Sequence, residues 1–325
     1  MNDLEQVPLA EVKPVESIAP AWLKRTLHAG GLIVAILGLP MVLSTFCVIP
    51  LLSFGGADDD LLVFSVISLT LGLLSVGAGG AAFWHADRAL QNKPSKPMQL
   101  PAAYLLAGIF IPLLLAGLIF QLADVLAGFF FPFLLVACAI LPPLWAVAWM
   151  IPRASSNEPA LTWRRGLLAF AGGATISALI ALALEILLPV VAMSLVNDLA
   201  DAVQSGLRGI VRALSNADVA AALTDPDFVY IFVQLAVIAP LAEELAKPLV
   251  TLPLLRRLSK KESFWIGAMA GAGFAALENV IYATAGLTLW AGILIVRALG
   301  SALHPLGSGL VAQGWRSPKR STAEA

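Results

Sequence analysis

The sequence has little charge for its length. Of its 325 residues, 13% are charged and 59% are hydrophobic, whereas about 25% are charged in soluble domains. A soluble protein of this size needs a more polar surface than the mean hydropathy of +0.87 allows. The 20 basic and 21 acidic residues nearly balance, and no basic run suits a nucleic acid. The composition therefore predicts a polytopic membrane protein with no nucleic-acid partner.

Cysteine is also scarce. Cys47 and Cys138 both lie in apolar stretches, and they form no CxxC pair. Two such cysteines exclude a disulfide framework, and they give no information about the redox compartment.

Long apolar stretches are abundant, and each can cross the bilayer as an α-helix of about 20 residues. The expected fold is therefore all-α, a polytopic membrane protein with about eight transmembrane helices. The spans are predicted at 29–53, 61–86, 101–122, 126–150, 166–195, 228–255, 263–284 and 287–314. The third and fourth are joined by a short turn at Asp124, which leaves a re-entrant hairpin as an alternative.

Five parts of the chain follow from this pattern. They are a cytoplasmic polar tail (1–27), a five-helix N-terminal membrane region (28–195), an external amphipathic segment (196–226), a three-helix catalytic-type core (227–314) and a cytoplasmic tail (315–325). The apolar residues of the external segment recur at helical spacing, which favours a packed connector over a substrate gate.

Positive charge predicts the orientation of the chain. One side of the membrane collects most of the Lys and Arg residues, whereas the other holds only Arg208 and Arg212. Because positive residues stay on the cytoplasmic side, both termini are expected there. We expect a multi-pass protein of the cell membrane, the bacterial plasma membrane.

Charged residues inside the spans give the strongest functional signal, because an ionisable group in the bilayer core costs at least ~2.5 kcal/mol. The first five spans hold one such residue, Glu185, which receives no role. The last three spans hold most of the others: Glu243, Glu244, Lys247, Glu278, Arg297 and His304, with Asn279 as a polar neighbour that suits an interhelical hydrogen bond.

Spacing and depth predict which of these groups meet. Lys247 follows Glu243 by four residues and Glu244 by three, so it can reach either carboxylate. At about 1.5 Å per residue, the two glutamates and His304 fall at one depth, whereas Glu278 lies near the level of Arg297. We therefore expect two clusters, one of them a buried Glu278–Arg297 pair.

The neighbouring residues suit close packing around a polar site. Gly267 and Gly271 form a GxxxG step that lets another helix approach the seventh span. Pro240, Pro248 and Pro305 each remove a backbone donor, which is tolerated where a helix lines a polar cavity.

Two carboxylates with a histidine allow several kinds of chemistry. A carboxylate beside a histidine activates water as a general base, and the same groups bind a divalent metal such as zinc. They also carry protons in transporters. The chemistry of these residues alone leaves hydrolysis and transport open.

Three motifs resemble those of the PrsW-type intramembrane proteases. Residues 240–248 (PLAEELAKP) resemble the family's EExxK motif, and residues 273–282 (GFAALENVIY) resemble its FxxxEN motif. Arg297 and His304, followed by Gly307, resemble its third motif. The resemblance covers about 240–314, and three motifs in order on three consecutive spans are specific.

The resemblance implies an intramembrane endopeptidase of the glutamate-dependent group that includes the CAAX prenyl proteases. Its partners would be the lipid bilayer and membrane-anchored protein substrates, such as anti-sigma factors. The implied catalytic residues are Glu243, Glu244, Glu278 and His304, with Glu244 and His304 as metal ligands and Lys247, Asn279 and Arg297 in supporting roles. Zinc and a metal-free glutamate mechanism both stay open.

The chain departs from the family in one respect. Family members usually carry a further helix with a second histidine, and here no histidine follows His304. A truncated chain, a member that needs fewer ligands and an inactive relative that binds membrane helices are the alternatives. A proton-coupled transporter is a weaker one, because no inverted repeat is apparent.

Overall fold

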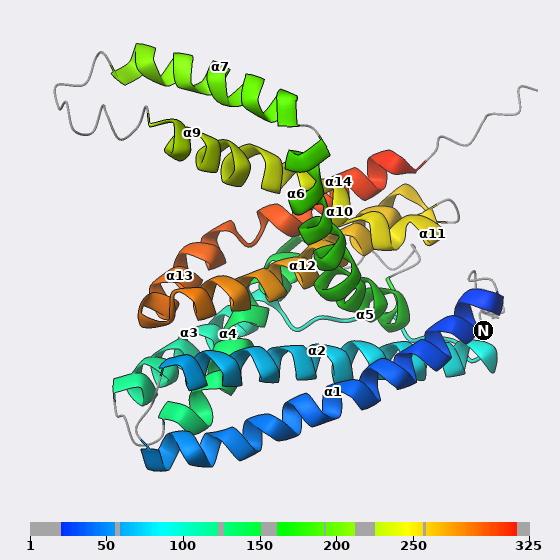
Figure 1. The fold of residues 1–325 in the computed structure, drawn as a ribbon. Coiled ribbons are helices and arrows are strands. Elements are labelled where there is room, and N and C mark those ends of the chain that lie inside the picture. The colour runs from blue at the N-terminus through cyan, green and yellow to red at the C-terminus, as the bar shows by residue number, and fades with distance from the viewer. Residues whose placement is uncertain are drawn as a thin grey trace, which may run out of the picture.

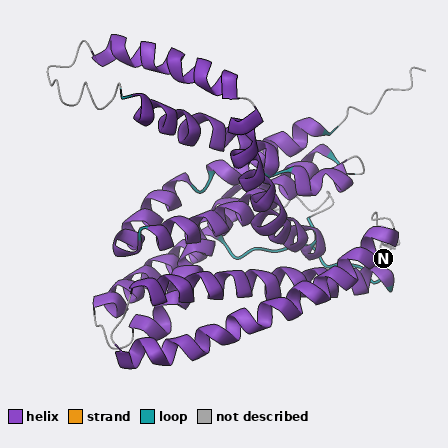
Figure 2. Ribbon diagram, in the orientation of Figure 1, coloured by secondary structure: helices purple, strands orange, loops and turns teal. Residues whose placement is uncertain are grey.

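The computed structural model describes residues 21–55, 59–122, 127–150, 161–191, 193–211, 225–255 and 258–316. These residues form helices joined by short connections, with one isolated β-bridge between Pro97 and Thr162 (Figure 2). The all-α fold is therefore confirmed. Most of the N-terminal polar tail and most of the C-terminal tail lie outside the described residues, as does the turn at Asp124.

Eight helical stretches within the described residues are long and apolar enough to cross a membrane, as the sequence predicts. The first four are single helices: α1 (Ala21–Gly55), α2 (Asp59–Leu90), α3 (Ala103–Leu122) and α4 (Ala127–Met150). α3 and α4 each reach the length of a separate span.

Three of the last four spans are interrupted. The fifth consists of α5 (Trp163–Gly172), a π-turn (Gly173–Ser177) and α6 (Ala178–Val191). The sixth consists of α9 (Pro226–Val233), a π-turn (Gln234–Ile238), α10 (Ala239–Ala246), a 3-10 turn (Leu249–Thr251) and α11 (Leu252–Leu255). The eighth consists of a 3-10 turn (Leu287–Leu289), α13 (Trp290–Gly300) and α14 (Leu303–Trp315). Pro240, Pro248 and Pro305 lie at or next to these breaks, because proline cannot continue the helical hydrogen-bond ladder.

The seventh span, α12 (Lys260–Ala285), is unbroken and lies at the centre of the bundle (Figure 1). It packs against α4, α5 and α14, and buried side chains occur along most of its length. A Cβ atom on Gly267 or Gly271 would collide with the backbone of α14, at Ser308 or His304. The predicted close approach at the GxxxG step is therefore confirmed, and α14 is the helix that makes it.

The start of α12 is fixed by local hydrogen bonds. Ser259 and Glu262 form a capping box, in which each side chain satisfies a backbone N–H of the other residue. Glu262 also accepts a hydrogen bond from Arg165 at 2.6 Å, which ties the first turn of α12 to α5. These contacts position the central helix against the fifth span.

α1 and α2 form a long antiparallel pair, the α1–α2 hairpin, along one side of the molecule (Figure 1). Small residues allow the two backbones to approach closely. A Cβ atom on Gly38 would lie 2.6 Å from Ser75 Cβ, and one on Gly72 would lie 2.7 Å from the backbone nitrogen of Val42. Close packing of small residues therefore holds this hairpin together.

α7 (Met193–Val211) covers much of the predicted external segment, and together with α9 it stands away from the bundle as the α7–α9 arm (Figure 1). Leu199, Val203 and Leu207 of α7 pack against Val229 and Val233 of α9. The apolar face of α7 thus meets another helix of the same chain.

Candidate active site

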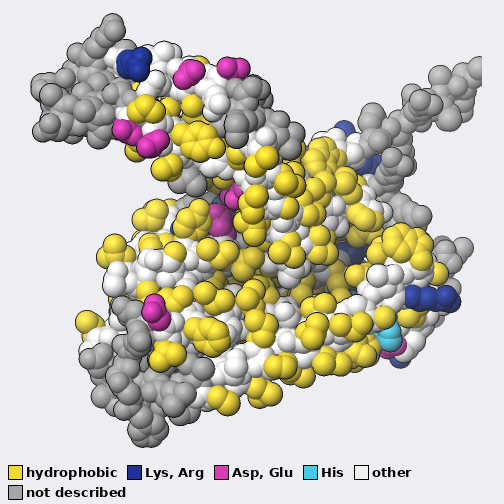
Figure 3. Space-filling model, in the orientation of Figure 1, with side chains coloured by type: hydrophobic (Ala, Val, Ile, Leu, Met, Phe, Trp, Pro, Cys, Tyr) yellow, Lys and Arg dark blue, Asp and Glu magenta, His cyan; other side chains and the backbone are white. Residues whose placement is uncertain are grey.

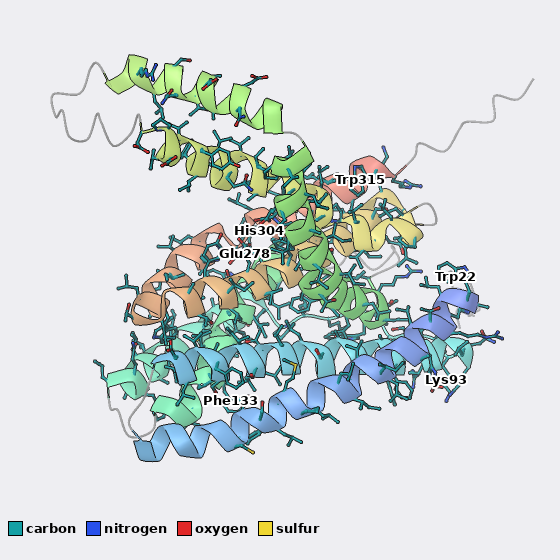
Figure 4. All side chains as sticks on the ribbon, in the orientation of Figure 1. Trp22, Lys93, Phe133, Glu278, His304 and Trp315 are labelled. Carbon is teal, nitrogen blue, oxygen red and sulfur yellow. The ribbon has the colours of Figure 1, made fainter. Side chains whose placement is uncertain are left out.

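Four helices bring the ionisable residues of the last three spans into one network. α10 supplies Glu243 and Glu244, with Lys247 directly after its last residue, α12 supplies Glu278 and Asn279, α13 supplies Arg297, and α14 supplies His304. Figure 4 shows Glu278 and His304 next to each other in the middle of the molecule. Every residue that the sequence singles out for the site lies in this network.

Lys247 is at the centre of the network, and its side chain is 1% exposed. Its Nζ donates to Glu243 Oε2 at 2.9 Å and to Glu244 Oε1 at 2.8 Å, and it lies 2.7 Å from His304 Nδ1. The ammonium also lies over the ring of Phe274, 4.6 Å from its centroid. Since an ammonium has three N–H donors, these three contacts use all of them.

A break in the sixth span fixes the backbone at Lys247. After α10 ends, the Thr251 N–H bonds to the carbonyl of Pro248 and no longer to that of Lys247. The carbonyl of Lys247 instead accepts a hydrogen bond from Ser177 Oγ at 3.0 Å. A polar side chain of the fifth span thereby holds the central lysine in place.

Glu278 connects α12 to both halves of the eighth span. Its Oε2 lies 2.8 Å from Arg297 Nη2, so the predicted buried pair is confirmed. The same oxygen lies 3.3 Å from His304 Nε2, contrary to the two separate clusters that the depths predict. The prediction assumed a continuous eighth span, whereas the chain turns at Ser301 and Ala302 between α13 and α14.

Asn279 and Arg297 link the network to its surroundings. Arg297 Nε donates to Asn279 Oδ1 at 2.6 Å, and Asn279 Nδ2 donates to the carbonyl of Ala139 in α4 at 2.9 Å. The guanidinium of Arg297 lies 4.4 Å from the ring centroid of Tyr282. Asn279 is thus the interhelical hydrogen-bonding residue that the sequence predicts.

Two contributors lie outside the sequence motifs, and a third lies within one but has no role assigned from the sequence. Ser177 comes from the fifth span and the Ala139 carbonyl from the fourth, both far from the motifs in sequence. Phe274 is the aromatic residue of the second motif, and its contact with Lys247 gives that position a physical role. Only the packing of the helices shows these contacts.

Glu243, Glu278 and His304 form a group with the composition of a metal site. One potential ligand atom from each lies within 4.8 Å of the others. The structure places Glu244 outside this group. Its carboxylate is 39% exposed, and its second oxygen faces the bare Cα of Gly307, where a Cβ atom would approach it to 2.7 Å.

Two carboxylates and an imidazole suit zinc, which in catalytic sites has three protein ligands and an open position. Lys247 sets a condition on such a site, because a neutral imidazole offers only one ring nitrogen with a free lone pair. If the ammonium donates to Nδ1, the ring proton lies on Nε2, which faces Glu278. A metal at Nε2 and an ammonium at Nδ1 therefore compete for one lone pair.

A large cavity of about 2450 Å³, the long cavity, reaches this network. The α1–α2 hairpin lines one side of it, and α5, α6 and α12 line the other, with mostly apolar side chains. Glu243 and Glu278 are among the lining residues, together with Glu185 of α6. Two carboxylates of the network are therefore accessible from inside the cavity.

The other histidines lie away from the network. His28 of α1 pairs with Asp87 of α2 at 3.8 Å, and His85 lies two residues before Asp87 on the same helix. Among the described residues, His304 is thus the histidine of the site.

Comparison with known proteins identifies a family. Residues 162–323 match the family model of the PrsW family intramembrane metalloproteases, a range that contains all three motifs and the fifth span. No curated protein and no solved structure matches the chain. From the family match and the three motifs within it, the chain belongs to the PrsW family.

Proposed function

We propose that the protein is an intramembrane endopeptidase that cuts membrane-anchored proteins within or next to their membrane segment. One observation carries the proposal: Glu243, Glu278 and His304 converge, and a large apolar cavity reaches the two carboxylates. Buried carboxylates with access to a substrate-sized space have the composition of a hydrolytic site. Membership of a protease family supports the same conclusion.

Glu243 is the carboxylate that activates water in this proposal. It faces the long cavity, and Lys247 holds one of its oxygens at 2.9 Å. As a general base it takes a proton from water as the oxygen attacks the peptide carbonyl, and it passes that proton to the leaving nitrogen. Glu244 holds the other side of Lys247 and so keeps the ammonium in position.

The cations stabilise the developing negative charge. Lys247 contacts Glu243 and His304, and Arg297 contacts Glu278. Positive charge fixed before the reaction lowers the energy of an oxyanion without further reorganisation. Asn279 keeps Arg297 in place through the 2.6 Å hydrogen bond to its Nε.

Glu243, Glu278 and His304 would hold a divalent metal such as zinc. When bound, such a metal polarises a water molecule and the peptide carbonyl. Without it, Glu243 and His304 orient the water. Both versions require Glu243, and only one responds to metal removal.

The substrate must locally unfold at the site. A peptide bond in a transmembrane helix is protected by its own helical hydrogen bonds, which are not readily broken in hydrocarbon. The charged network supplies polar groups that replace those bonds near the scissile bond. By its family resemblance, the protein acts on membrane-anchored regulators such as anti-sigma factors, in a plasma membrane with both termini cytoplasmic.

A cleavage assay in liposomes tests the proposal. The full chain is incubated with a panel of single-span proteins, and wild type is compared with Glu243→Gln and with Asp201→Asn. Asp201 is the control, since it is an exposed carboxylate of α7 outside the lining of the cavity. Cleavage is expected with wild type and Asp201→Asn and not with Glu243→Gln.

In a second part of the assay, a chelator is added to the liposomes and zinc is then restored. Loss and recovery of cleavage would support the metal version, and unchanged cleavage would support the metal-free one. Equal cleavage by wild type and Glu243→Gln would contradict the proposal. Capture of substrate helices by well-folded wild type without cleavage would indicate a non-catalytic relative.

A further inference from the structure

The long cavity extends over the depth of a membrane. Arg164 and Glu185 both line it and lie on the fifth span, 21 residues apart in sequence. At 1.5 Å per residue this separation is about 30 Å, the thickness of the hydrocarbon core. The cavity is thus a passage along the bundle.

The cavity is large enough for one transmembrane helix. A helix of 20 residues is about 30 Å long and at least ~10 Å across, so it fills a cylinder of roughly 2400 Å³. The cavity measures about 2450 Å³, and its lining includes Ile67 and Leu71 of α2 and Leu179 and Leu182 of α6. Both the size and the apolar walls suit a membrane helix.

The two ends of the cavity differ in how their charges are paired. Glu243 and Glu278 line it at the active network, where Lys247 and Arg297 neutralise them, and Glu185 lies at the same end. Lys24, Lys93 and Arg164 line the other end, whereas Arg165, also in the lining, is already paired with Glu262. Figure 4 shows Lys93 near Trp22, far from Glu278 and His304, and Figure 3 shows Lys and Arg side chains at the end of the bundle where α1 begins.

Polar atoms at the basic end lack partners among the described residues. Arg164 Nε is buried without an acceptor, although Nη2 of the same side chain donates to the carbonyl of Lys93 at 2.8 Å. His85 is 9% exposed and lines the cavity, and its Nδ1 also has no hydrogen-bond partner. A buried guanidinium N–H without an acceptor, together with Lys24 and Lys93 in the same lining, suits the binding of an anionic group there.

We propose that the long cavity receives the transmembrane helix of the substrate, with an acidic segment next to that helix bound by Lys24, Lys93 and Arg164. The inference rests on the proposed protease function, since it brings the far end of the helix to Glu243 and Glu278. The basic end lies on the side that the charge distribution predicts to be cytoplasmic. Substrates are therefore membrane-anchored proteins with an acidic cytoplasmic flank, cut near the opposite end of their helix.

Polar groups at both ends of the cavity, and the distance between them, argue for a helix and against a lipid. A lipid carries its charge at one end, and its chains reach only about half of the ~30 Å core. A protein helix spans the whole passage and presents polar groups at both ends. An acidic cytoplasmic flank is also selective, because most membrane proteins have basic residues on that side.

A photocrosslinking experiment tests this inference independently of cleavage. Full-length Glu243→Gln protein carries a photoreactive residue at Leu179, which lines the cavity and is 68% exposed, in liposomes of zwitterionic lipid. The matched control carries it at Leu187 of the same helix, which is 55% exposed and does not line the cavity. The probes are two single-span proteins that differ only in the flank, with four Asp or four Ser residues.

The acidic-flank protein is expected to crosslink at Leu179 and not at Leu187. Its yield should exceed that of the Ser-flank protein by about two- to five-fold, and more at low salt. Lys93→Glu should remove this preference, because Lys93 is exposed at the basic end. Lys260→Glu should keep it, because Lys260 is an exposed lysine outside the lining.

Other outcomes overturn the inference. Equal crosslinking at Leu187 or no dependence on the flank would each exclude the proposed occupant. Glu243-dependent cleavage by wild type in the same liposomes would then leave the protease function standing. Flank-dependent crosslinking at Leu179 without any cleavage by wild type would instead contradict the protease function alone.

Discussion

Two regions of this molecule are stabilised in different ways. The α1–α2 hairpin is held by close packing of small residues, and only 17% of the apolar stretch of α1 is buried. The region of α10, α12, α13 and α14 is held by a network of ion pairs around α12, whose apolar stretch is 72% buried. The difference shows that the protein keeps its intramembrane charged groups in the region around α12, away from the α1–α2 hairpin.

The physical reason is the cost of charge in hydrocarbon. A lone ionisable group is expensive there, so the groups of α10, α12, α13 and α14 persist because each has a partner of opposite charge or a hydrogen bond. The hairpin needs no such compensation over most of its length, because its glycines and apolar residues cost nothing to bury. Charge is thus concentrated in the region that carries the proposed chemistry.

The largest expected effect separates the two neighbouring glutamates. Glu243→Gln should lower the cleavage rate by about 10²–10⁴-fold, because it removes the general base while keeping an acceptor for Lys247. Glu244→Gln should lower the rate by about ten-fold, because Glu244 faces Gly307 and only positions Lys247. Initial rates in liposomes measure both. A larger loss in Glu244→Gln would reverse the two assignments.

The next effect concerns the centre of the network. Lys247→Met should lower the free energy of unfolding by about 3–5 kcal/mol, because two carboxylates lose their buried counter-charge. Lys96→Met is the control, since Lys96 is exposed and has no side-chain ion pair among the described residues. Unfolding in mixed detergent measures both variants. Similar stabilities would mean that the network contributes little to folding.

A pair of glycines in α2 tests the packing of the α1–α2 hairpin. Gly79→Ala should lower the free energy of unfolding by about 1–3 kcal/mol, because the new methyl group would meet the backbone of Ala35. Gly77→Ala should leave stability unchanged or raise it slightly, because nothing lies within 4 Å of its Cβ position. The same unfolding assay applies. Equal losses would contradict packing as the force that holds the hairpin.

The smallest expected effect concerns Asn279, which links α12 to α4 and to Arg297 of α13. Asn279→Ala should cost about 0.6–1.7 kcal/mol, the range for a hydrogen bond between membrane helices. It should also lower the cleavage rate, because Arg297 loses the acceptor that fixes its Nε. Asn279→Asp, which keeps an acceptor for Arg297, should retain more activity. If both variants cleave like wild type, Asn279 serves packing only.

The sequence predicts much of this site because the helical repeat fixes which nearby residues of one helix share a face. Lys247 reaches Glu243 and Glu244 because residues three and four apart share a face, and the structure has both contacts. The pair formed by Glu278 and Arg297 also follows, since a buried charge needs an opposite one. The contact between His304 and Glu278 does not follow, because the turn between α13 and α14 changes the depth of His304.

The sequence by itself determined that the protein lies in a membrane, how many spans it has and which spans carry charge. These properties depend on composition and on distances along single helices. The tertiary structure decided which carboxylates converge on His304, that Ser177 and Ala139 support the network, and that a helix-sized cavity leads to it. These contacts depend on where helices break and on which faces they pack. Neither is set by hydrophobic periodicity, since lipid-facing and protein-facing residues are equally apolar in a membrane.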